Sequence, residues 1–180
     1  MDKELEELTR DNILQPKIAQ WFAQMEKIRE KLVRFVSKLS IDELDFSPNK
    51  KQIETIGTLL LHIAAVEWSW IFMDIDGKEM DFDGWKYAFS LRPEVNIPQI
   101  QNNDIIVYLD RLNLVRTEVH NRLIKMTDNE LEKIIESDDE KYTIEWILYH
   151  ILEHEIIHLG QIQLIYRLYK LEKKKAVEKA

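Results

Sequence analysis

Residues 143–170, TIEWILYHILEHEIIHLGQIQLIYRLYK, have the spacing of one long helix, and this segment constrains the fold more than any other. Two histidines, His154 and His158, interrupt its apolar stripe. Burying an imidazole without a hydrogen bond or a ligand costs about 1–3 kcal/mol, so both rings need a partner inside the protein. The stripe that they interrupt consists of Ile144, Ile147, Leu148, Ile151, Ile162, Ile165 and Tyr169.

Three further segments, 16–39, 53–74 and 103–126, show the same helical spacing of apolar residues. Pro16 suits a first helical turn, and Asn103 or Asp104 can cap the third of these segments. Four amphipathic helices without a convincing sheet predict an all-α protein, a four-helix bundle with short connecting helical turns.

No Pro-, Gly- or Ser-rich linker divides the 180 residues, so we expect a single domain over 1–180. Its ends, 1–12 and 171–180, have the composition of tails.

The connections between these helices carry signals of their own. Ser40 to Glu43 and Thr127 to Glu130 both have the form of a capping box, which starts a short helical turn. Residues 133–144 predict either a small hairpin or a loop that ends where Thr143 caps the last helix. Residues 78–100 are rich in aromatic side chains without a clean period, and we expect either an aromatic plug at one end of the bundle or a substrate lid.

Composition excludes several classes of function. The formal net charge of -8 argues against nucleic acid and against an anionic membrane as partner, because both attract clustered positive charge. The most apolar stretch, residues 56–73, contains His62 and Glu67, which favours a core helix over a membrane span. The acidic N-terminus does not resemble a signal peptide, and we expect a cytoplasmic protein.

The chain contains no cysteine, which leaves His, Asp and Glu as the candidate metal ligands. His150, His154 and His158 follow one another at intervals of four, so they lie within an arc of about 80° on one helix. The outer two are about 12 Å apart along the axis, which is too far for one ion to bind all three.

The choice of ligand pair therefore lies between His150 with His154 and His154 with His158. The second pair lies deeper in the stripe and is preferred, with His150 as a neighbouring cavity residue or an alternative ligand. His62, on the inner side of the second helix, is the third candidate, whereas His120 falls beside its stripe and is expected at a boundary.

Three neutral imidazoles with an open position form the ligand set of a catalytic divalent site, with zinc as the default and nickel as an alternative. The competing interpretation is a hydrogen-bonded histidine cluster in the core.

Residues 154–158 also match H-E-x-x-H, in which the glutamate, here Glu155, is the general base of zinc peptidases. Those enzymes pair the motif with a substrate-binding sheet edge and a downstream ligand. Neither is evident here, because only a polar tail follows Tyr169, so we reject the peptidase interpretation.

Two motifs together carry a family resemblance. TIGTLLLHIAAVEWSWI, followed downstream by YHILEHEIIHLGQIQLI, resembles the DinB/YfiT-like superfamily of metal-binding four-helix bundles, with one histidine on helix two and H-x-x-x-H-x-G-Q on helix four. The resemblance implies that His62, His154 and His158 hold the metal. Leu159 stands where many members have arginine, and Gly160 is expected to permit close approach of a neighbouring helix or a substrate.

The resemblance also implies three functional hypotheses for a small-molecule substrate, and a homodimer. The first is a metal-dependent S-transferase that uses a low-molecular-weight thiol. The second is a hydrolase that uses a metal-activated water, with Glu155 as its base. The third is a metal- or ligand-binding stress protein without catalytic activity.

Overall fold

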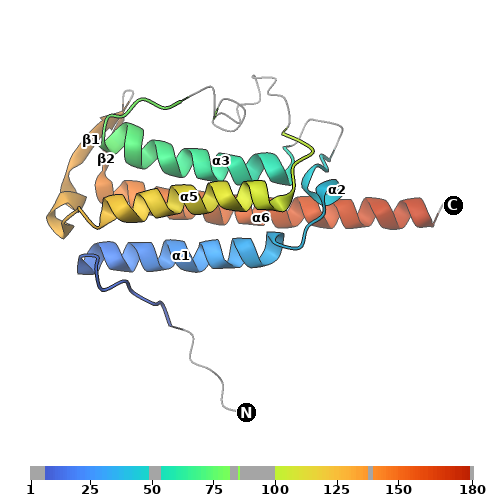
Figure 1. The fold of residues 1–180 in the computed structure, drawn as a ribbon, viewed down its shortest axis with the longest axis horizontal. Helices are drawn as coiled ribbons and strands as arrows, with labels where there is room; N and C mark the ends of the chain where they lie inside the picture. The colour runs from blue at the N-terminus through green and yellow to red at the C-terminus, as the bar shows by residue number, and fades with distance from the viewer. Residues whose placement is uncertain (1–6, 49–53, 82–84, 86–99, 138–139, 179–180) are drawn as a thin grey trace, which may run out of the picture.

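Four long helices lie side by side in the computed structural model (Figure 1). The structure describes residues 7–48, 54–81, 85, 100–137 and 140–178. The long helices are α1 (Pro16–Val36), α3 (Ile56–Trp68) with its π-helical continuation η1 (Ser69–Ile75), α5 (Ile105–Leu123) and α6 (Ile144–Val177). α3 packs against both α5 and α6, and α1 packs against α6. The predicted all-α bundle is confirmed.

Short elements make the connections. They are α2 (Ile41–Leu44), the 3₁₀ turn η2 (Asp128–Glu132) and the antiparallel strands β1 (Ile134–Ser137) and β2 (Glu140–Thr143). Both predicted capping boxes are present, at the starts of α2 and η2. The hairpin was therefore the correct alternative for residues 133–144.

Side-chain caps fix the starts of the long helices. The Thr143 hydroxyl accepts a hydrogen bond from the Trp146 amide at 3.1 Å, and the Asp104 carboxylate accepts one from the Ile106 amide at 3.0 Å. Thr55 caps α3 in the same way, so that helix begins at Ile56, three residues after the predicted start. Such caps satisfy amide donors that have no partner within the helix.

Two features of the long helices differ from the prediction. α6 continues to Val177, so most of the expected tail 171–180 is helical, and its described residues are exposed. The second helix changes to π geometry at Ser69, whose hydroxyl donates to the Val66 carbonyl at 3.0 Å. A hydroxyl that bonds the preceding turn competes with the regular helical ladder, which is typical of sites where helices deviate.

The aromatic-rich segment 78–100 lies mostly outside the described residues. Met80 and Trp85 are buried, and the Arg111 guanidinium lies over the Trp85 ring at 4.8 Å from its centroid. The choice between a plug and a lid stays a prediction.

One helical segment among the described residues, Ile56–Ile75, has the length and composition of a membrane span. The apolar window within it is 72% buried inside the bundle. A buried core helix passes the same compositional test, so this finding is weak evidence for a membrane.

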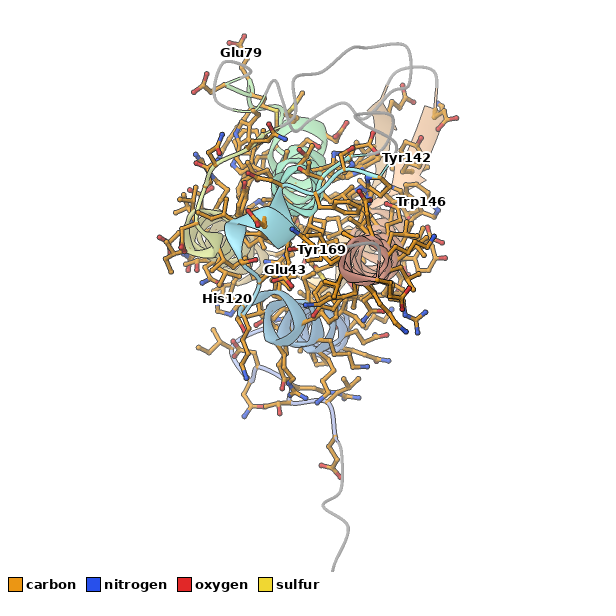
Figure 2. All side chains as sticks on the ribbon, turned by 90° about the vertical axis from the view of Figure 1, so that its right-hand side faces the viewer. Glu43, Glu79, His120, Tyr142, Trp146 and Tyr169 are labelled. Carbon is orange, nitrogen blue, oxygen red and sulfur yellow. The ribbon has the colours of Figure 1, made fainter. Side chains whose placement is uncertain are left out.

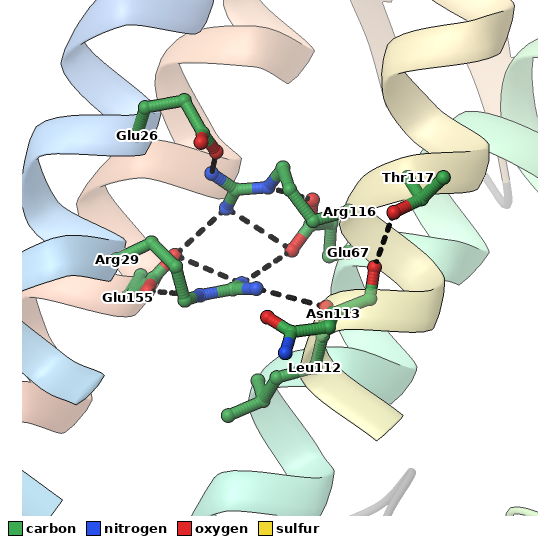
Figure 3. A network of polar contacts seen from close by, with 8 residues as sticks. All are labelled: Glu26, Arg29, Glu67, Leu112, Asn113, Arg116, Thr117 and Glu155. Atoms are coloured by element: carbon green, nitrogen blue, oxygen red, sulfur yellow. Dashed lines mark hydrogen bonds and ion pairs between the residues drawn. The ribbon is translucent and has the colours of Figure 1, made fainter. Parts of the chain in front are cut away.

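A cluster of buried charges joins the four long helices (Figure 3). Arg29 of α1 donates to Glu155 of α6 at 2.7 Å and to Glu67 of α3 at 2.7 Å. Arg116 of α5 donates to the same two carboxylates, at 2.6 Å to Glu67 and 3.0 Å to Glu155, and also to the half-exposed Glu26 at 2.8 Å. Each long helix thus contributes one buried charged residue to the network.

Charge pairing favours the ionised forms of Glu67 and Arg116 in the core. Burial alone disfavours the carboxylate of Glu67, but Arg116 and Arg29 together outweigh that effect and lower the pKa of Glu67. Burial likewise disfavours the charged Arg116, and Glu67 and Glu155 more than compensate, which raises the pKa of Arg116. Removing one member of such a buried set costs more than the set itself contributes, because a charge is left without its partner.

Replacing Glu67 with glutamine therefore tests the network. We expect Glu67→Gln to lower the free energy of unfolding by about 3 kcal/mol at pH 7, measured by urea denaturation, because two buried arginines would share one remaining buried carboxylate. The matched change of the exposed Glu172 to glutamine should alter it by less than about 0.5 kcal/mol. Equal losses in the two variants would contradict this account of the core.

Candidate metal centre

Three histidines from two helices converge inside the bundle. His62 lies in the middle of α3, whereas His154 and His158 lie one turn apart on α6. The Nε2 atom of His154 is 3.1 Å from Nε2 of His62 and 3.0 Å from Nε2 of His158. The structure therefore brings together the preferred ligand pair and the predicted third histidine.

The spacing of these nitrogens fits a metal. In a tetrahedral site with metal–nitrogen bonds of about 2.0–2.1 Å, two ligand nitrogens lie about 3.3 Å apart. The two nitrogen pairs at 3.0 and 3.1 Å are close to that value, and one ligand atom from each of the three residues lies within 4.8 Å of the others. Three protein ligands leave a fourth position of a tetrahedron for a water or a substrate.

Electrostatics favour the neutral forms of His154 and His158, and the neutral imidazole is the form that binds a metal. Burial, followed by the neighbouring His158, His62 and His150, lowers the pKa of His154 to about 2. Burial also lowers the pKa of His158, against the opposing effects of Gln161 and Glu54.

Gln161 fixes the tautomer of His158. The Nδ1–H of His158 donates to the Gln161 side-chain oxygen at 2.7 Å, so the lone pair on Nε2 points to the cluster. An outer hydrogen bond of this kind orients a metal-bound histidine and raises its basicity. The Gly-Gln pair of the sequence motif therefore contributes through its glutamine, one turn beyond the ligand.

His150 does not join the three histidines. Its ring stacks on Trp146 with centroids 5.0 Å apart and planes 4° apart, and the edge of Trp70 contacts it at 5.2 Å. Trp146 in turn stacks on Tyr142 of strand β2, with ring centroids 4.3 Å apart. Figure 2 labels both residues, on the side of the bundle where the hairpin lies. Tyr142, Trp146, Trp70 and His150 form a contiguous set of rings that we call the aromatic wall. Its His150 ring lies 6.1 Å from the His154 ring, centroid to centroid.

Glu155 lies between the two α6 histidines in sequence, but its carboxylate belongs to the buried charge network. Both oxygens accept hydrogen bonds from arginines, Oε1 from Arg29 and Oε2 from Arg29 and Arg116. Arginine side chains of α1 and α5 thus engage both oxygens of this carboxylate. Its predicted role as a base gains no support from this geometry.

The predicted close approach at Gly160 is wrong for the neighbouring helices of this chain. A Cβ atom at Gly160 would meet no described heavy atom within 4 Å. Close packing occurs instead at Gly57, where a Cβ would lie 2.7 Å from the Tyr108 ring.

Glu54 is a nearby acidic group that sequence reasoning missed. It directly precedes the Thr55 cap of α3, is partly buried, and acts electrostatically on His158. Its only sequence signal is its place at a helix start, which is also where carboxylates are common for structural reasons.

Comparison with known proteins agrees with the geometry. A family model described as the DinB superfamily matches residues 24–162, which include all three histidines. The chain belongs to the DinB superfamily. The uncharacterized protein YkkA of Bacillus subtilis (strain 168) is 20% identical to this DinB protein over 167 residues, covering 92% of this chain and 95% of YkkA.

Two solved structures resemble this DinB protein in fold. A conserved protein from Enterococcus faecalis superposes with a TM-score of 0.67 at 13% identity, covering 83% of this chain and 94% of that one. A DinB-like protein from Bacillus cereus ATCC 10987 superposes with a TM-score of 0.51 at 15% identity, covering 84% and 89%. At these identities the likeness shows the shared bundle alone.

The depressed pKa of His154 predicts a pH-dependent stability of the metal-free protein. In the unfolded chain a histidine takes up its proton near pH 6.5, whereas folded His154 stays neutral down to about 2. Lowering the pH from 7.5 to 5.5 thus favours the unfolded state, by up to about 1.4 kcal/mol from this residue. Urea denaturation in EDTA should show that His154→Gln loses less stability over this interval than the wild type. Identical losses would refute a neutral His154.

Replacing Gln161 with leucine tests the outer hydrogen bond. We expect Gln161→Leu to weaken zinc binding about 10-fold, because the His158 ring loses its orientation, when a chromophoric chelator competes for the ion. The exposed Gln163, two residues away, provides the control, since Gln163→Leu should leave the affinity unchanged. A similar effect of both substitutions would remove Gln161 from the site.

Proposed function

We propose that this DinB protein is a metal-dependent S-transferase that joins a low-molecular-weight thiol to a small electrophilic substrate. The convergence of three imidazoles from two helices supports a resident divalent ion, with zinc first and nickel as the alternative. Such an ion, when bound, supplies Lewis acidity at its open position and lowers the pKa of a thiol or water there.

The residues of the chain provide the surroundings for this chemistry. His62, His154 and His158 would hold the ion, and Gln161 would keep His158 in the binding tautomer. The chain has no thiol of its own, so the thiol must come from a small molecule. Such thiols are kept reduced in the cytosol, which makes the cytoplasm the consistent compartment.

The aromatic wall gives the substrate a surface next to the metal centre. Trp70 and Trp146 contact the His150 ring, and His150 lies beside His154. Trp146 is 37% exposed, so one end of the wall is open to solvent. Flat aromatic rings favour a small organic electrophile with an apolar or planar body over a highly charged one.

Glu54 supports a second candidate function, hydrolysis. Glu54 acts electrostatically on His158, and no arginine among the described residues pairs with its carboxylate, so it is a better candidate base for a bound water than Glu155. In that case water would take the place of the thiol as nucleophile.

Cobalt substitution tests the metal centre without relying on activity. We expect one Co²⁺ per chain, with the visible absorption of a four-coordinate site, and a loss of affinity of about 100-fold or more in His62→Ala. His120→Ala is the matched control, because His120 pairs with Asp11 outside the cluster. No cobalt spectrum in the wild type would refute the metal site and favour the hydrogen-bonded histidine core.

Thiol titration then separates the functional candidates. Adding L-cysteine or glutathione to the cobalt protein should produce a sulfur-to-cobalt charge-transfer band, and the zinc protein should conjugate the thiol to 1-chloro-2,4-dinitrobenzene. Hydrolysis of p-nitrophenyl acetate without thiol, reduced in Glu54→Gln, would instead favour the hydrolase. Metal binding with neither activity would leave the non-catalytic binder as the remaining candidate.

A further inference from the structure

A pocket of about 480 Å³ lies between the end of α2 and the last turns of α6. Small-molecule sites in proteins commonly have volumes of roughly 300–1,000 Å³. Its polar and aromatic lining consists of Asp42, Asp45 and Phe46 beside α2 and of Tyr169, Glu172 and Lys173 on α6. Tyr169 follows His158 by 11 residues, which is roughly 16 Å along the helix axis. This space, which we call the α2–α6 pocket, is therefore separate from the candidate metal centre.

Contacts between α2 and α6 hold the two sides of the pocket together. The Lys170 ammonium lies 2.9 Å from the carboxylate of Glu43, whose side chain is 12% exposed. The Phe46 ring meets the Tyr169 ring edge to face, with centroids 5.3 Å apart. Figure 2 looks at the bundle from this end and labels Glu43 and Tyr169. The pocket is thus built by the fold itself, from two segments that are far apart in the sequence.

The charges that line the pocket do not balance. Asp42, Asp45 and Glu172 contribute three carboxylates, and Lys173 contributes one ammonium group. Among the described residues, none of these three carboxylates has an ion-pair partner. The Lys173 ammonium lies over the Tyr169 ring instead, 5.3 Å from its centroid. The pocket therefore has an excess of two negative charges, which attracts cations.

Asp45 has a carboxylate oxygen without a partner. Its Oδ2 atom accepts a hydrogen bond from the Asn102 amide at 2.8 Å, whereas its Oδ1 atom is buried and accepts none. No other buried or half-buried residue that the structure describes has a buried side-chain oxygen or nitrogen in this state. A buried acceptor without a donor is unfavourable, so this oxygen indicates a missing hydrogen-bond donor. Because Asp45 lines the pocket, a ligand bound there can supply that donor.

The charge of Asp45 also acts on the core. Burial raises the pKa of the Tyr108 hydroxyl, and the Asp45 carboxylate adds to that effect. A positive group beside Asp45 would reduce this unfavourable interaction between its charge and the interior.

The aromatic rings favour an organic cation over a metal ion. The Tyr169 ring already has two ammonium groups near its face, Lys173 at 5.3 Å and Lys170 at 5.8 Å from its centroid. Together with Phe46 it also offers apolar surface for the carbon chain of a ligand. Calcium and magnesium ions require about six or more oxygen ligands, which a lining with two aromatic rings and a lysine does not provide.

We propose that the α2–α6 pocket binds an aliphatic diamine in its doubly protonated form. The two positive charges match the excess of two negative charges in the lining. Asp42 and Asp45 stand on one side of the pocket and Glu172 on the other, so each ammonium group has a carboxylate of its own. One ammonium donates to Oδ1 of Asp45, and the methylene groups between the two ends lie on the Phe46 and Tyr169 rings.

Calorimetric titration with 1,4-diaminobutane tests the site. The full chain at pH 7.5 and low ionic strength should bind one diamine, and butylamine, which has a single ammonium group, should bind about 10-fold more weakly. Binding should be the same in EDTA, because none of the three histidines lines the pocket. No saturable binding of the diamine, equal binding of butylamine, or binding that disappears in EDTA would each overturn the proposal.

Variants that remove one carboxylate charge place the diamine in the pocket. Glu172→Gln and Asp45→Asn should each weaken diamine binding about 10-fold or more, because one ammonium group loses its charged acceptor. Glu132→Gln makes the same change of net charge at an exposed position of η2, outside the pocket lining, and should leave the affinity unchanged. An equal loss in Glu132→Gln would mean that the diamine responds to net charge alone, and would refute the site.

Thermal unfolding separates binding from folding. A ligand that binds the folded state raises the unfolding temperature, so the diamine should raise it in the wild type and in Glu132→Gln more than in Glu172→Gln. Glu172 is exposed, so its variant keeps the fold even where Asp45→Asn, which alters the contact with Asn102, does not. Shifts of equal size in the wild type and in Glu172→Gln would contradict a diamine site between α2 and α6.

Discussion

The buried charge network of Arg29, Glu67, Arg116 and Glu155 constrains the relative positions of the four long helices. Apolar side chains tolerate small rotations and translations of the helices, because hydrophobic attraction is not directional. Buried charged groups do not tolerate such movements, because each lost hydrogen bond leaves a charge with an uncompensated desolvation cost. With one member on each long helix, the network couples the rotation of every helix to that of the others.

The candidate metal centre depends on this coupling because its histidines lie on two of the same helices. Glu67 follows His62 by five residues on α3, and Glu155 lies between His154 and His158 on α6. Fixing the two carboxylates on shared arginines therefore fixes the separation and rotation of the backbones that carry the imidazoles. A shift of about 1 Å between α3 and α6 would move the nitrogens away from a common bonding distance, since metal–ligand distances tolerate only about 0.2 Å.

The sequence predicted the histidines and the bundle because both depend on periodicity. An imidazole within an apolar stripe must be satisfied by a hydrogen bond or a metal. Two such positions on one helix and a third on another left two alternatives, a metal site and a hydrogen-bonded histidine cluster. The charge network was missed for the opposite reason. Arg29 and Arg116 also fall near apolar stripes, but a long basic side chain at a stripe edge ordinarily reaches solvent. Which carboxylate it meets is decided by helices distant in sequence.

Glu155 shows how a local motif misleads. Within H-E-x-x-H its neighbours suggest a base, yet on the helix it points to the arginines of α1 and α5. The missing information was which side of α6 Glu155 occupies in the bundle.

The bundle contains two buried polar clusters on adjacent helical turns. They offset the desolvation cost of buried polar groups in opposite ways. The arginines and glutamates pair with one another, so that cluster needs nothing from outside. Burial lowers the pKa of His154 and of His158, which favours the neutral form that binds a metal, and Nε2 of His154 lies 3.1 Å from Nε2 of His62 and 3.0 Å from Nε2 of His158. Uncompensated guanidinium charge nearby would oppose a divalent cation between the three histidines. The pairing of Arg29 and Arg116 with carboxylates is thus a condition for metal binding at the candidate centre as well as for the fold.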